Sequence, residues 1–274
     1  MLAALAVFLS GIVVNAFRWQ QFLRPLGLAL PPRTLVRLYF VGTFFNAFLP
    51  TGFGGDAYRS LMMRQASGTM APPLATAFLE RLAGLAGLAI LAVVGALLRL
   101  AAGDRGSVTW TGLSLSLAVL AVSAIALTLA GSARRAGDGA PPSGLRAKLR
   151  LFADAFATAG RERPAVVRGV AIGVVSAALL VAVHAFLVRS VSADIPIAAL
   201  PVIVVIASLT TVLPVTINGL GLREAAYVWC LGAYGVSHDV ALAFALLVLG
   251  VTLASSAVGG VVYALAGGEL SPRP

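Results

Sequence analysis

The chain has 274 residues, of which 59% are hydrophobic and only 11% are charged, and its mean hydropathy is +0.97. Soluble domains carry about 25% charged residues, so this composition excludes an ordinary soluble enzyme and predicts an all-α polytopic membrane protein. A net charge of +10 would suit a nucleic-acid partner in a soluble protein, but in so apolar a chain it indicates membrane orientation.

Several uncharged runs are long enough to cross a bilayer as helices, which takes about 20 apolar residues. In chain order they cover residues 2–17, 82–98, 106–133, 169–188 and 240–268. The sequence therefore predicts about five full transmembrane helices. Within the fourth run, Gly169-x-x-x-Gly173 fits close helix packing, and His184 is expected to be a hydrogen-bonded packing residue.

Two further uncharged stretches, 38–55 and 195–222, are interrupted by Pro50 and Pro214, each of which is followed by glycine. Proline removes a helix hydrogen bond and glycine tolerates irregular backbone, so we expect broken helices at 34–66 and 196–234. Irregular backbone persists at membrane depth only when it is buried in protein or lines a wet cavity. The two breaks are therefore the first candidates for a functional site.

The charged residues lie mainly in two stretches. Arg18, Arg24, Arg33 and Arg37 contribute +4 with no acid among them, and the loop 132–163 carries seven basic against three acidic residues. By the positive-inside rule both stretches are cytoplasmic, and no nucleic-acid partner is expected. Both can be cytoplasmic if the broken segments are re-entrant hairpins that enter from opposite sides, with the N-terminus outside and the C-terminus inside. The alternative is that both segments cross fully, which makes seven spans.

The two broken segments also resemble each other. Pro50 precedes Arg59 by nine positions, and Pro214 precedes Arg223 by nine. Three predicted spans separate the starts of the two copies, and an odd number of crossings inverts the second copy. Inverted repeats with paired broken helices place a binding site near the bilayer midplane. The chain then has three parts, which are a first membrane repeat, a basic cytoplasmic loop and a second, inverted membrane repeat, at 1–131, 132–163 and 164–274.

A helix is expected to restart after each break, at about Asp56 and at about Asn218, both of which are good N-cap residues. A helix N-terminus presents free backbone N–H groups and about half a positive charge, here directly after Gly55 and Gly219. Each break therefore predicts a place where an anion can bind inside the membrane.

Arg59 and Arg223 follow about one turn later in these helices. Arginine can hold a phosphate with two parallel hydrogen bonds. At this depth a lipid phosphate is the natural anion. The alternative is that Asp56 pairs with Arg59 and Arg223 with Glu224, which would only stabilise the hairpins. Asn46 and Asn218 either satisfy backbone freed by the breaks or contact a headgroup. The predicted substrate-binding residues are Arg59, Arg223, Asn46, Asp56, Asn218, Glu224, Gly55 and Gly219.

Two other features have predicted roles. Glu80 and Arg81, near the start of a predicted helix at 74–100, are expected to form a paired clamp that braces the first hairpin. In the cytoplasmic loop, one helical face carries only large apolar residues, which favours an interfacial helix on anionic lipid, with an intracellular partner as the alternative. These residues are Leu145, Leu149, Phe152 and Phe156.

No motif indicates catalysis, a metal or a cofactor. Cys230 is the single cysteine, and Lys148, the single lysine, stands in no phosphate-binding loop. The sequence also lacks a His-Glu-x-x-His pattern. We therefore expect no catalytic residue, no bound metal and no cofactor.

The motifs at the breaks carry a family resemblance. Residues 44–50 (Phe-Phe-Asn-Ala-Phe-Leu-Pro), 54–59 (Gly-Gly-Asp-Ala-Tyr-Arg), 77–82 (Ala-Phe-Leu-Glu-Arg-Leu) and 219–225 (Gly-Leu-Gly-Leu-Arg-Glu-Ala) resemble the lysylphosphatidylglycerol synthase transmembrane-region family, also called flippase-like domain proteins. The resemblance covers nearly the whole chain in the right order. It implies an inner-membrane protein that moves lipids between leaflets. The best-known members add a soluble aminoacyltransferase, for which this chain has no room, so a stand-alone member is expected.

From these observations we expect a lipid flippase of the bacterial cytoplasmic (inner) membrane rather than an enzyme. It would hold an anionic lipid, phospholipid or polyprenyl-phosphate-linked, with the headgroup between the two hairpins. Its partners would be membrane lipids, and a separate lipid-modifying enzyme is a further candidate. One alternative is an integral-membrane lipid transferase with Asp56 or Glu224 as base. Another is an accessory subunit of a lipid glycosyltransferase.

Overall fold

The computed structural model describes residues 1–48, 53–132, 144–211 and 219–266, and every regular element within these ranges is a helix. In chain order they are α1 (Leu2–Leu23), η1 (Arg24–Leu26), α2 (Pro32–Phe48), α3 (Gly54–Met62), α4 (Arg64–Ser67), α5 (Ala71–Ala101), α6 (Ser107–Ser132), α7 (Leu145–Arg161), α8 (Arg163–Ser190), η2 (Ile197–Ala199), α9 (Leu200–Thr210), α10 (Leu222–Gly232) and α11 (His238–Leu265). The predicted all-α class is confirmed.

Among the described residues, five helices are long and apolar enough to cross a membrane. They are α1 with its η1 extension, α5, α6, α8 and α11, which agrees with the five predicted spans. The outer face of α6 exposes Leu117, Val122 and Ile125. Large apolar side chains exposed along a long apolar helix suit lipid better than water. The chain is a multi-pass membrane protein.

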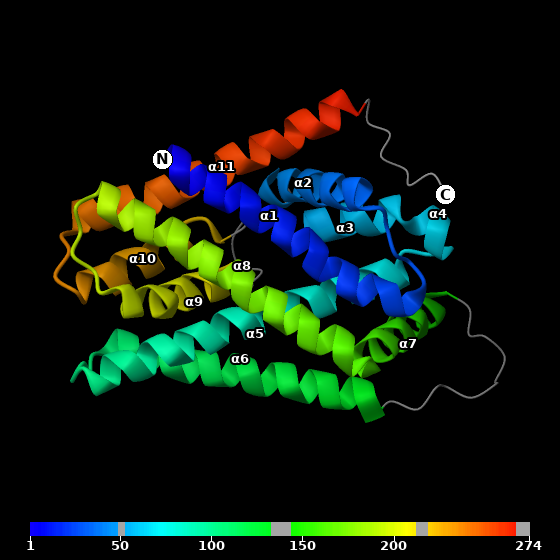
Figure 1. Ribbon diagram of the computed structural model, residues 1–274, viewed down its shortest axis with the longest axis horizontal. Helices are drawn as coiled ribbons and strands as arrows, with labels where there is room; N and C mark the ends of the chain where they lie inside the picture. Colours follow the sequence, from blue (N-terminus) through cyan, green and yellow to red (C-terminus); the bar gives the residue numbers. More distant parts are fainter. Residues whose placement is uncertain (49–52, 133–143, 212–218, 267–274) are drawn as a thin grey trace.

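The helix ends gather at two opposite ends of the molecule (Figure 1). One end holds the last turns of α1, α6 and α11, the first turns of α2, α5 and α8, and the short helices α4 and α7. The other end holds the start of α1, the α5–α6 and α10–α11 junctions and the start of α9. The basic residues of 24–37 and of α7 therefore lie at the same end, as their assignment to one side of a membrane requires.

The two broken segments each contribute a pair of helices. α2 and α3 pack against each other with their outer ends at the α7 end of the molecule, and α9 contacts α10 toward the opposite end (Figure 1). Residues 49–52 and 212–218, which join the members of each pair and include Pro50 and Pro214, lie outside the described residues. The re-entrant course and the inverted repeat remain predictions.

The expected restart points differ from the observed ones. α3 begins at Gly54, two residues before Asp56, because the Asn46 side-chain oxygen accepts a hydrogen bond from the Gly55 N–H at 2.7 Å and caps the helix from α2. α10 begins at Leu222, four residues after Asn218. Gly221, with φ +83°, is the N-cap residue of this helix, and its N–H donates to Glu224 Oε2 at 2.6 Å.

Helix α5 occupies the centre of the fold and packs against α1, α3, α6, α7, α8 and α9. Its crossing with α8 is closed by two glycines, since a Cβ on Gly87 would lie 2.3 Å from the carbonyl carbon of Gly173. Gly169 instead faces α1, where a Cβ would lie 2.5 Å from Cζ of Phe22. The predicted close packing at Gly169 and Gly173 therefore exists, but each glycine serves a different neighbour.

The predicted amphipathic helix is α7, and its apolar face is divided between two surroundings. Leu145 and Leu149 are exposed, whereas the ring of Phe152 makes an edge contact with Phe78 of α5 and stacks near Phe156. α7 thus packs on α5 and α6 by its C-terminal half and keeps leucines outward in its N-terminal half. That these leucines lie on anionic lipid remains a prediction.

Candidate functional site

Five charged side chains from three helices meet in the protein interior. Arg18 comes from α1, Asp56 and Arg59 from α3, and Glu80 and Arg81 from α5. These residues are called the charge cluster below. Asp56 and Glu80 are 1% exposed and Arg59 is 3% exposed, while the Arg81 side chain is 31% exposed.

Glu80 of α5 contacts side chains from α1, α2 and α3. Its Oε1 accepts hydrogen bonds from Arg18 Nε at 2.9 Å and from Arg18 Nη2, and the Tyr39 hydroxyl of α2 donates to the same oxygen at 3.1 Å. Its Oε2 lies 3.5 Å from Arg59 Nη2. One carboxylate therefore ties α5 to α1, α2 and α3.

Asp56 is shared by two arginines. Arg59, three residues later on α3, bonds Asp56 Oδ1, and Arg81 Nε bonds Asp56 Oδ2. The Arg59 guanidinium also lies between two rings, with its central carbon 4.6 Å from the centre of Trp19 and 4.2 Å from that of Tyr39. Cation–π contacts of this kind stabilise a guanidinium that has been removed from water.

The charge cluster carries three positive and two negative groups, so its formal charge is +1. Each carboxylate is paired, which offsets the high cost of removing these charges from water. Arg59 Nη1 is nevertheless buried and finds no hydrogen-bond partner among the described residues. A buried site with an excess of one cation favours an anion nearby.

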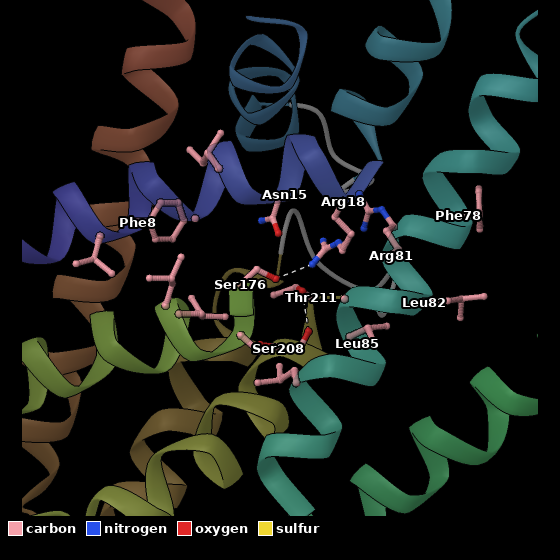
Figure 2. A pocket seen from close by; sticks show the side chains of 18 of the residues that line it. Phe8, Asn15, Arg18, Phe78, Arg81, Leu82, Leu85, Ser176, Ser208 and Thr211 are labelled. Atoms are coloured by element: carbon pink, nitrogen blue, oxygen red, sulfur yellow. Dashed lines mark hydrogen bonds between the residues drawn. The ribbon is translucent and has the colours of Figure 1, made fainter. Parts of the chain in front are cut away.

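A cavity of about 500 Å³ lies beside the charge cluster, between α1, α5, α8 and the end of α9 (Figure 2). Most of its wall is apolar, with Phe8, Leu82, Leu85 and Leu180 among the lining residues. Its polar lining comprises two arginines, one amide and three hydroxyls, which are Arg18, Arg81, Asn15, Ser176, Ser208 and Thr211. This volume lies within the usual range for a small-molecule site.

Helix periodicity explains how the wall is built. Phe8, Ile12, Asn15 and Arg18 follow one another on α1 at spacings of four, three and three, and all four line the cavity. Residues at these spacings share one face of a helix, which here changes from apolar to polar toward its C-terminal end. Arg18 Nη1 also donates to the Ser176 hydroxyl of α8 at 2.7 Å, so the polar part of the wall is continuous across two helices.

The substrate-binding residues predicted around the first break come together, but none of them lines the cavity. Asp56 and Arg59 belong to the buried charge cluster, Asn46 caps α3, and the Gly55 N–H is bonded to Asn46. A Cβ on Gly55 would lie 2.1 Å from the carbonyl oxygen of Gly42, so glycine here allows α2 and α3 to touch. Of Glu80 and Arg81, which were predicted as a clamp, Glu80 braces the helices and Arg81 also faces the cavity.

Around the second break the local contacts are different. Arg223 Nη2 donates to Glu224 Oε1 at 3.0 Å, and Glu224 also accepts from the Gly221 N–H at the start of α10. Gly219 has φ +76°, a conformation that favours glycine, and Asn218 lies outside the described residues. In this structure Arg223 and Glu224 are paired with each other, and neither lines the cavity.

His184 has the predicted packing role. Its Nδ1 lies 2.8 Å from the Leu180 carbonyl oxygen and its Nε2 lies 2.7 Å from the Tyr227 hydroxyl. With Nδ1 protonated, the ring donates to the carbonyl and accepts from the tyrosine, so both nitrogens are satisfied. No group of three or more His, Cys, Asp or Glu side chains within the described ranges is placed to hold a metal ion.

Sequence reasoning missed Arg18, Asn15 and Tyr39. It counted Arg18 among the charges on the cytoplasmic side, whereas the residue is 7% exposed and paired with Glu80. A signal was present, because Arg18 and Asn15 are three residues apart in a largely apolar helix. Two polar residues at that spacing share a face, and polar groups inside a membrane helix usually face protein or a wet cavity.

Comparison with known proteins adds one finding. A family model described as "Lysylphosphatidylglycerol synthase TM region" matches residues 1–260, which includes every residue of the charge cluster and of the cavity wall. Comparisons with curated proteins and with solved structures gave no significant match.

Proposed function

The chain belongs to the lysylphosphatidylglycerol synthase TM-region family, and on this premise we propose that it is a translocase that moves an anionic lipid between leaflets. Its membrane would be the bacterial cytoplasmic membrane. The lipid would carry a phosphate, on either a phospholipid or a polyprenyl carrier. The observation that carries the proposal is the cavity, whose apolar wall ends at two arginines of the charge cluster.

An amphipathic ligand matches this wall in its two parts. Alkyl or isoprenoid carbon would lie against residues such as Leu82, Leu85 and Leu180, and the phosphate would lie beside Arg18 and Arg81. Arginine suits this role because its planar guanidinium offers five N–H donors and stays charged. Described residues use three of the donors of Arg18, two toward Glu80 and one toward Ser176.

The arginines predicted from the two breaks would contact the phosphate only after a conformational change. Arg59 belongs to the charge cluster and does not line the cavity, and its buried Nη1 has no hydrogen-bond partner among the described residues, so a rearrangement of α3 would be needed to bring it to the phosphate. Arg223 and Glu224, which pair with each other here, would engage when the second hairpin moves. Substrate contact by Arg59 and Arg223 remains a prediction.

Transfer chemistry is less well supported than transport. A lipid transferase needs a carboxylate or histidine that can accept a proton from substrate. Asp56 is bonded to two arginines, and Glu80 to Arg18, Tyr39 and Arg59. Such saturated carboxylates suit the support of a binding site and not general-base catalysis.

Reconstitution into liposomes tests the proposed transport. Purified protein should accelerate the movement of a fluorescent phosphatidylglycerol between leaflets, and Arg81→Ala should slow it about ten- to a hundredfold, because a charge-assisted hydrogen bond contributes about 1.5–3 kcal/mol. Arg37→Ala is the matched control, since Arg37 is an exposed arginine on α2 and its loss should leave the rate unchanged. Rates equal to those of protein-free liposomes for every anionic lipid tried would overturn the proposal.

A further inference from the structure

We infer that the N-terminal half of α7 binds an anionic leaflet and that this contact positions the start of α3, so that the charge of the membrane surface acts on the first broken segment. The leaflet contact is separate from the cavity, and its effect on α3 does not depend on whether the chain moves lipid. Three observations carry the inference, namely the exposed charges at one end of the molecule, the exposed leucines of α7 and a series of aromatic contacts from α7 to α3.

Exposed charge is distributed unequally between the two ends of the molecule. At the end that holds α7 (Figure 1), the described residues of η1, α2, α4, α7 and the first turns of α8 expose eight Arg or Lys side chains and two acids, with Glu162 between α7 and α8 included. At the opposite end, the described residues expose two arginines and two acids, which are Arg105, Arg189, Asp194 and Asp239. Anionic phospholipid attracts basic side chains near the membrane surface. The α7 end is therefore complementary to an anionic leaflet.

The N-terminal half of α7 exposes apolar and basic side chains together. Leu145 is 72% exposed and Leu149 is 60% exposed, and both lie on one face of the helix. Arg146 and Lys148 are also exposed. Leucines that enter the acyl boundary, with cations that reach the headgroup phosphates, are typical of a helix that lies in a membrane surface. An anionic leaflet accounts for both kinds of side chain, whereas a purely polar, acidic partner would leave the leucines in water.

The place of α7 in the fold brings these side chains to a membrane boundary. α7 ends at Arg161, and α8, which is long and apolar enough to span the membrane, begins at Arg163. The C-terminal half of α7 packs on the ends of two further spans, since a Cβ on Gly160 would lie 3.0 Å from Cβ of Ala130, in the last turn of α6, and 3.8 Å from Leu79 of α5. The N-terminal half of α7 therefore extends from the ends of three spans, where lipid headgroups lie.

A series of aromatic contacts connects α7 with the residue before α3. The ring of Phe152 meets the ring of Phe78 of α5 edge-on, with the two centroids 5.6 Å apart. The Phe78 ring also stacks with that of Phe53, with centroids 5.8 Å apart. Phe53 is the N-cap residue of α3. Phe78 is therefore the shared neighbour of α7 and of the chain that follows the first break.

Phe53 is tied to the charge cluster as well. The central carbon of the Arg81 guanidinium lies 4.5 Å from the centre of the Phe53 ring, and Arg81 Nε bonds Asp56 Oδ2. Phe78 and Arg81 are three residues apart on α5, so they share one face and hold Phe53 together. Edge and stacked ring contacts have preferred geometries, so a ring keeps its position best when its neighbours are fixed. Holding α7 at the leaflet therefore fixes Phe152, then Phe78 and then Phe53, after which α3 begins.

Hydrogen–deuterium exchange of the full-length protein in nanodiscs tests both steps. The two lipid compositions are phosphatidylcholine alone and phosphatidylcholine mixed with phosphatidylglycerol. The mixed lipid should slow amide exchange in the N-terminal half of α7 by about tenfold or more, because each Lys or Arg near an anionic surface adds to the attraction. The amides of α3 should also exchange more slowly in the mixed lipid, because the start of that helix is then held in place.

A charge variant tests the contact with the leaflet. Arg146→Gln/Lys148→Gln removes two exposed cations of α7 and should abolish the response of both helices to the anionic lipid. Arg105→Gln is the matched control, because it removes an exposed arginine at the opposite end of the molecule and should leave both responses unchanged. Each response compares two lipid compositions within one variant, so it does not depend on the overall stability of that variant.

A ring variant separates the second step from the first. Phe152→Leu keeps an apolar side chain on α7 but removes the ring that meets Phe78, so α7 should still respond to the anionic lipid and α3 should not. The variant leaves Arg18 and Arg81 in place, so a response of α3 to lipid bound in the cavity would persist. Phe186→Leu, at an exposed phenylalanine of α8, is the matched control and should preserve both responses.

Equal exchange of α7 in the two lipid compositions would overturn the inference. So would a response of α7 without one of α3, or a response of α3 that survives Phe152→Leu. Equal slowing of α7 in phosphatidylcholine nanodiscs by inorganic phosphate, or by soluble polyglutamate, would also overturn it, because the occupant would then be a free anion or an acidic protein. Both responses in a protein that moves no lipid would uphold the inference and overturn the translocase proposal alone.

Discussion

At the scale of single residues, the charge cluster depends most on Glu80. It is the residue that bonds arginines from two different helices and a tyrosine from a third. Its loss would leave Arg18 buried without a carboxylate, since among the described residues the ion pair of Arg18 is with Glu80. An uncompensated buried charge is among the most destabilising changes that a single substitution can make.

We therefore expect Glu80→Leu to destabilise the protein by about 3–5 kcal/mol. The double variant Arg18→Met/Glu80→Leu should be less destabilised than Glu80→Leu alone, because it removes both members of the pair and keeps the formal charge of the cluster at +1. Thermal unfolding in detergent, followed by tryptophan fluorescence, provides the measurement. If the double variant lost as much stability as the two single variants together, Arg18 and Glu80 would not be coupled.

The same residues show how far a sequence predicts a site of this kind. Asp56 and Arg59 are three residues apart on one helix, so their spacing alone allowed an ion pair between them. The structure shows this ion pair. Arg18 and Glu80 are 62 residues apart, and their pairing depends on how α1 packs beside α5. No local pattern contains that information, and for this reason the polar wall of the cavity could not be derived from the breaks.

At the scale of elements, the lengths of the apolar runs were sufficient to predict the spans, because a bilayer fixes how many residues a helix needs to cross it. The helix starts after the breaks were less predictable. Residues such as Asp56 and Asn218 are favourable caps by type, but α3 is capped by Asn46 from the preceding helix and α10 starts after Gly221. A partner from another helix fixed the start of α3, and a local contact between the Gly221 N–H and Glu224 fixed the start of α10.

The α5–α8 crossing gives a prediction at this scale. Gly87→Ala should destabilise the protein by about 1–3 kcal/mol, because the added Cβ would lie 2.3 Å from backbone of α8 and would force the two helices apart. Gly250→Ala in the interior of α11 is the control, since its Cβ meets only Met1 Cε at 4.0 Å. That change should be neutral or slightly stabilising, as alanine favours helix over glycine. Equal melting temperatures for the two variants would contradict the close contact.

The α5–α6 junction gives a pH-dependent prediction. Asp104 accepts hydrogen bonds from the Gly106 N–H at 2.8 Å, the Thr109 hydroxyl at 2.9 Å and Arg99 Nε at 3.0 Å. The Gly106 N–H above all holds the pKa of Asp104 below its ordinary value of 3.8. A pKa lowered by folding adds stability that is present above the unfolded-state pKa and is lost as pH falls through the folded-state pKa.

Asp104→Asn should therefore lower the melting temperature at pH 7, and the difference from the unsubstituted protein should shrink as the pH falls below 3.8. The melting temperature of both proteins across this pH range provides the measurement. Asp194→Asn, at an exposed acid in the loop after α8, is the control and should have little effect at any pH. A difference that grew on acidification would have the wrong sign for this account.

At the scale of the whole molecule, transport between leaflets requires that the cavity open toward each side in turn. The proposed arrangement achieves this with two hairpins that enter from opposite sides, and in Figure 1 the α2–α3 and α9–α10 pairs have their outer ends at opposite ends of the molecule. If each broken segment instead crossed the membrane once, the start and the end of each pair would lie on opposite sides. The course of the broken segments therefore decides whether the paired-hairpin mechanism applies.

Cysteine labelling distinguishes the two courses. The single native cysteine, Cys230, is buried, so Cys230→Ala provides a background for new cysteines at four exposed positions that bracket the pairs, which are Arg33, Ala66, Ser192 and Ser237. If both segments are re-entrant, an impermeant maleimide should label positions 33 and 66 from the cytoplasmic side only, and positions 192 and 237 from the opposite side only. Comparing right-side-out with inverted vesicles gives this result directly. Seven full spans would instead place 33 and 66, and likewise 192 and 237, on opposite sides, and that pattern would exclude alternating access by paired re-entrant hairpins.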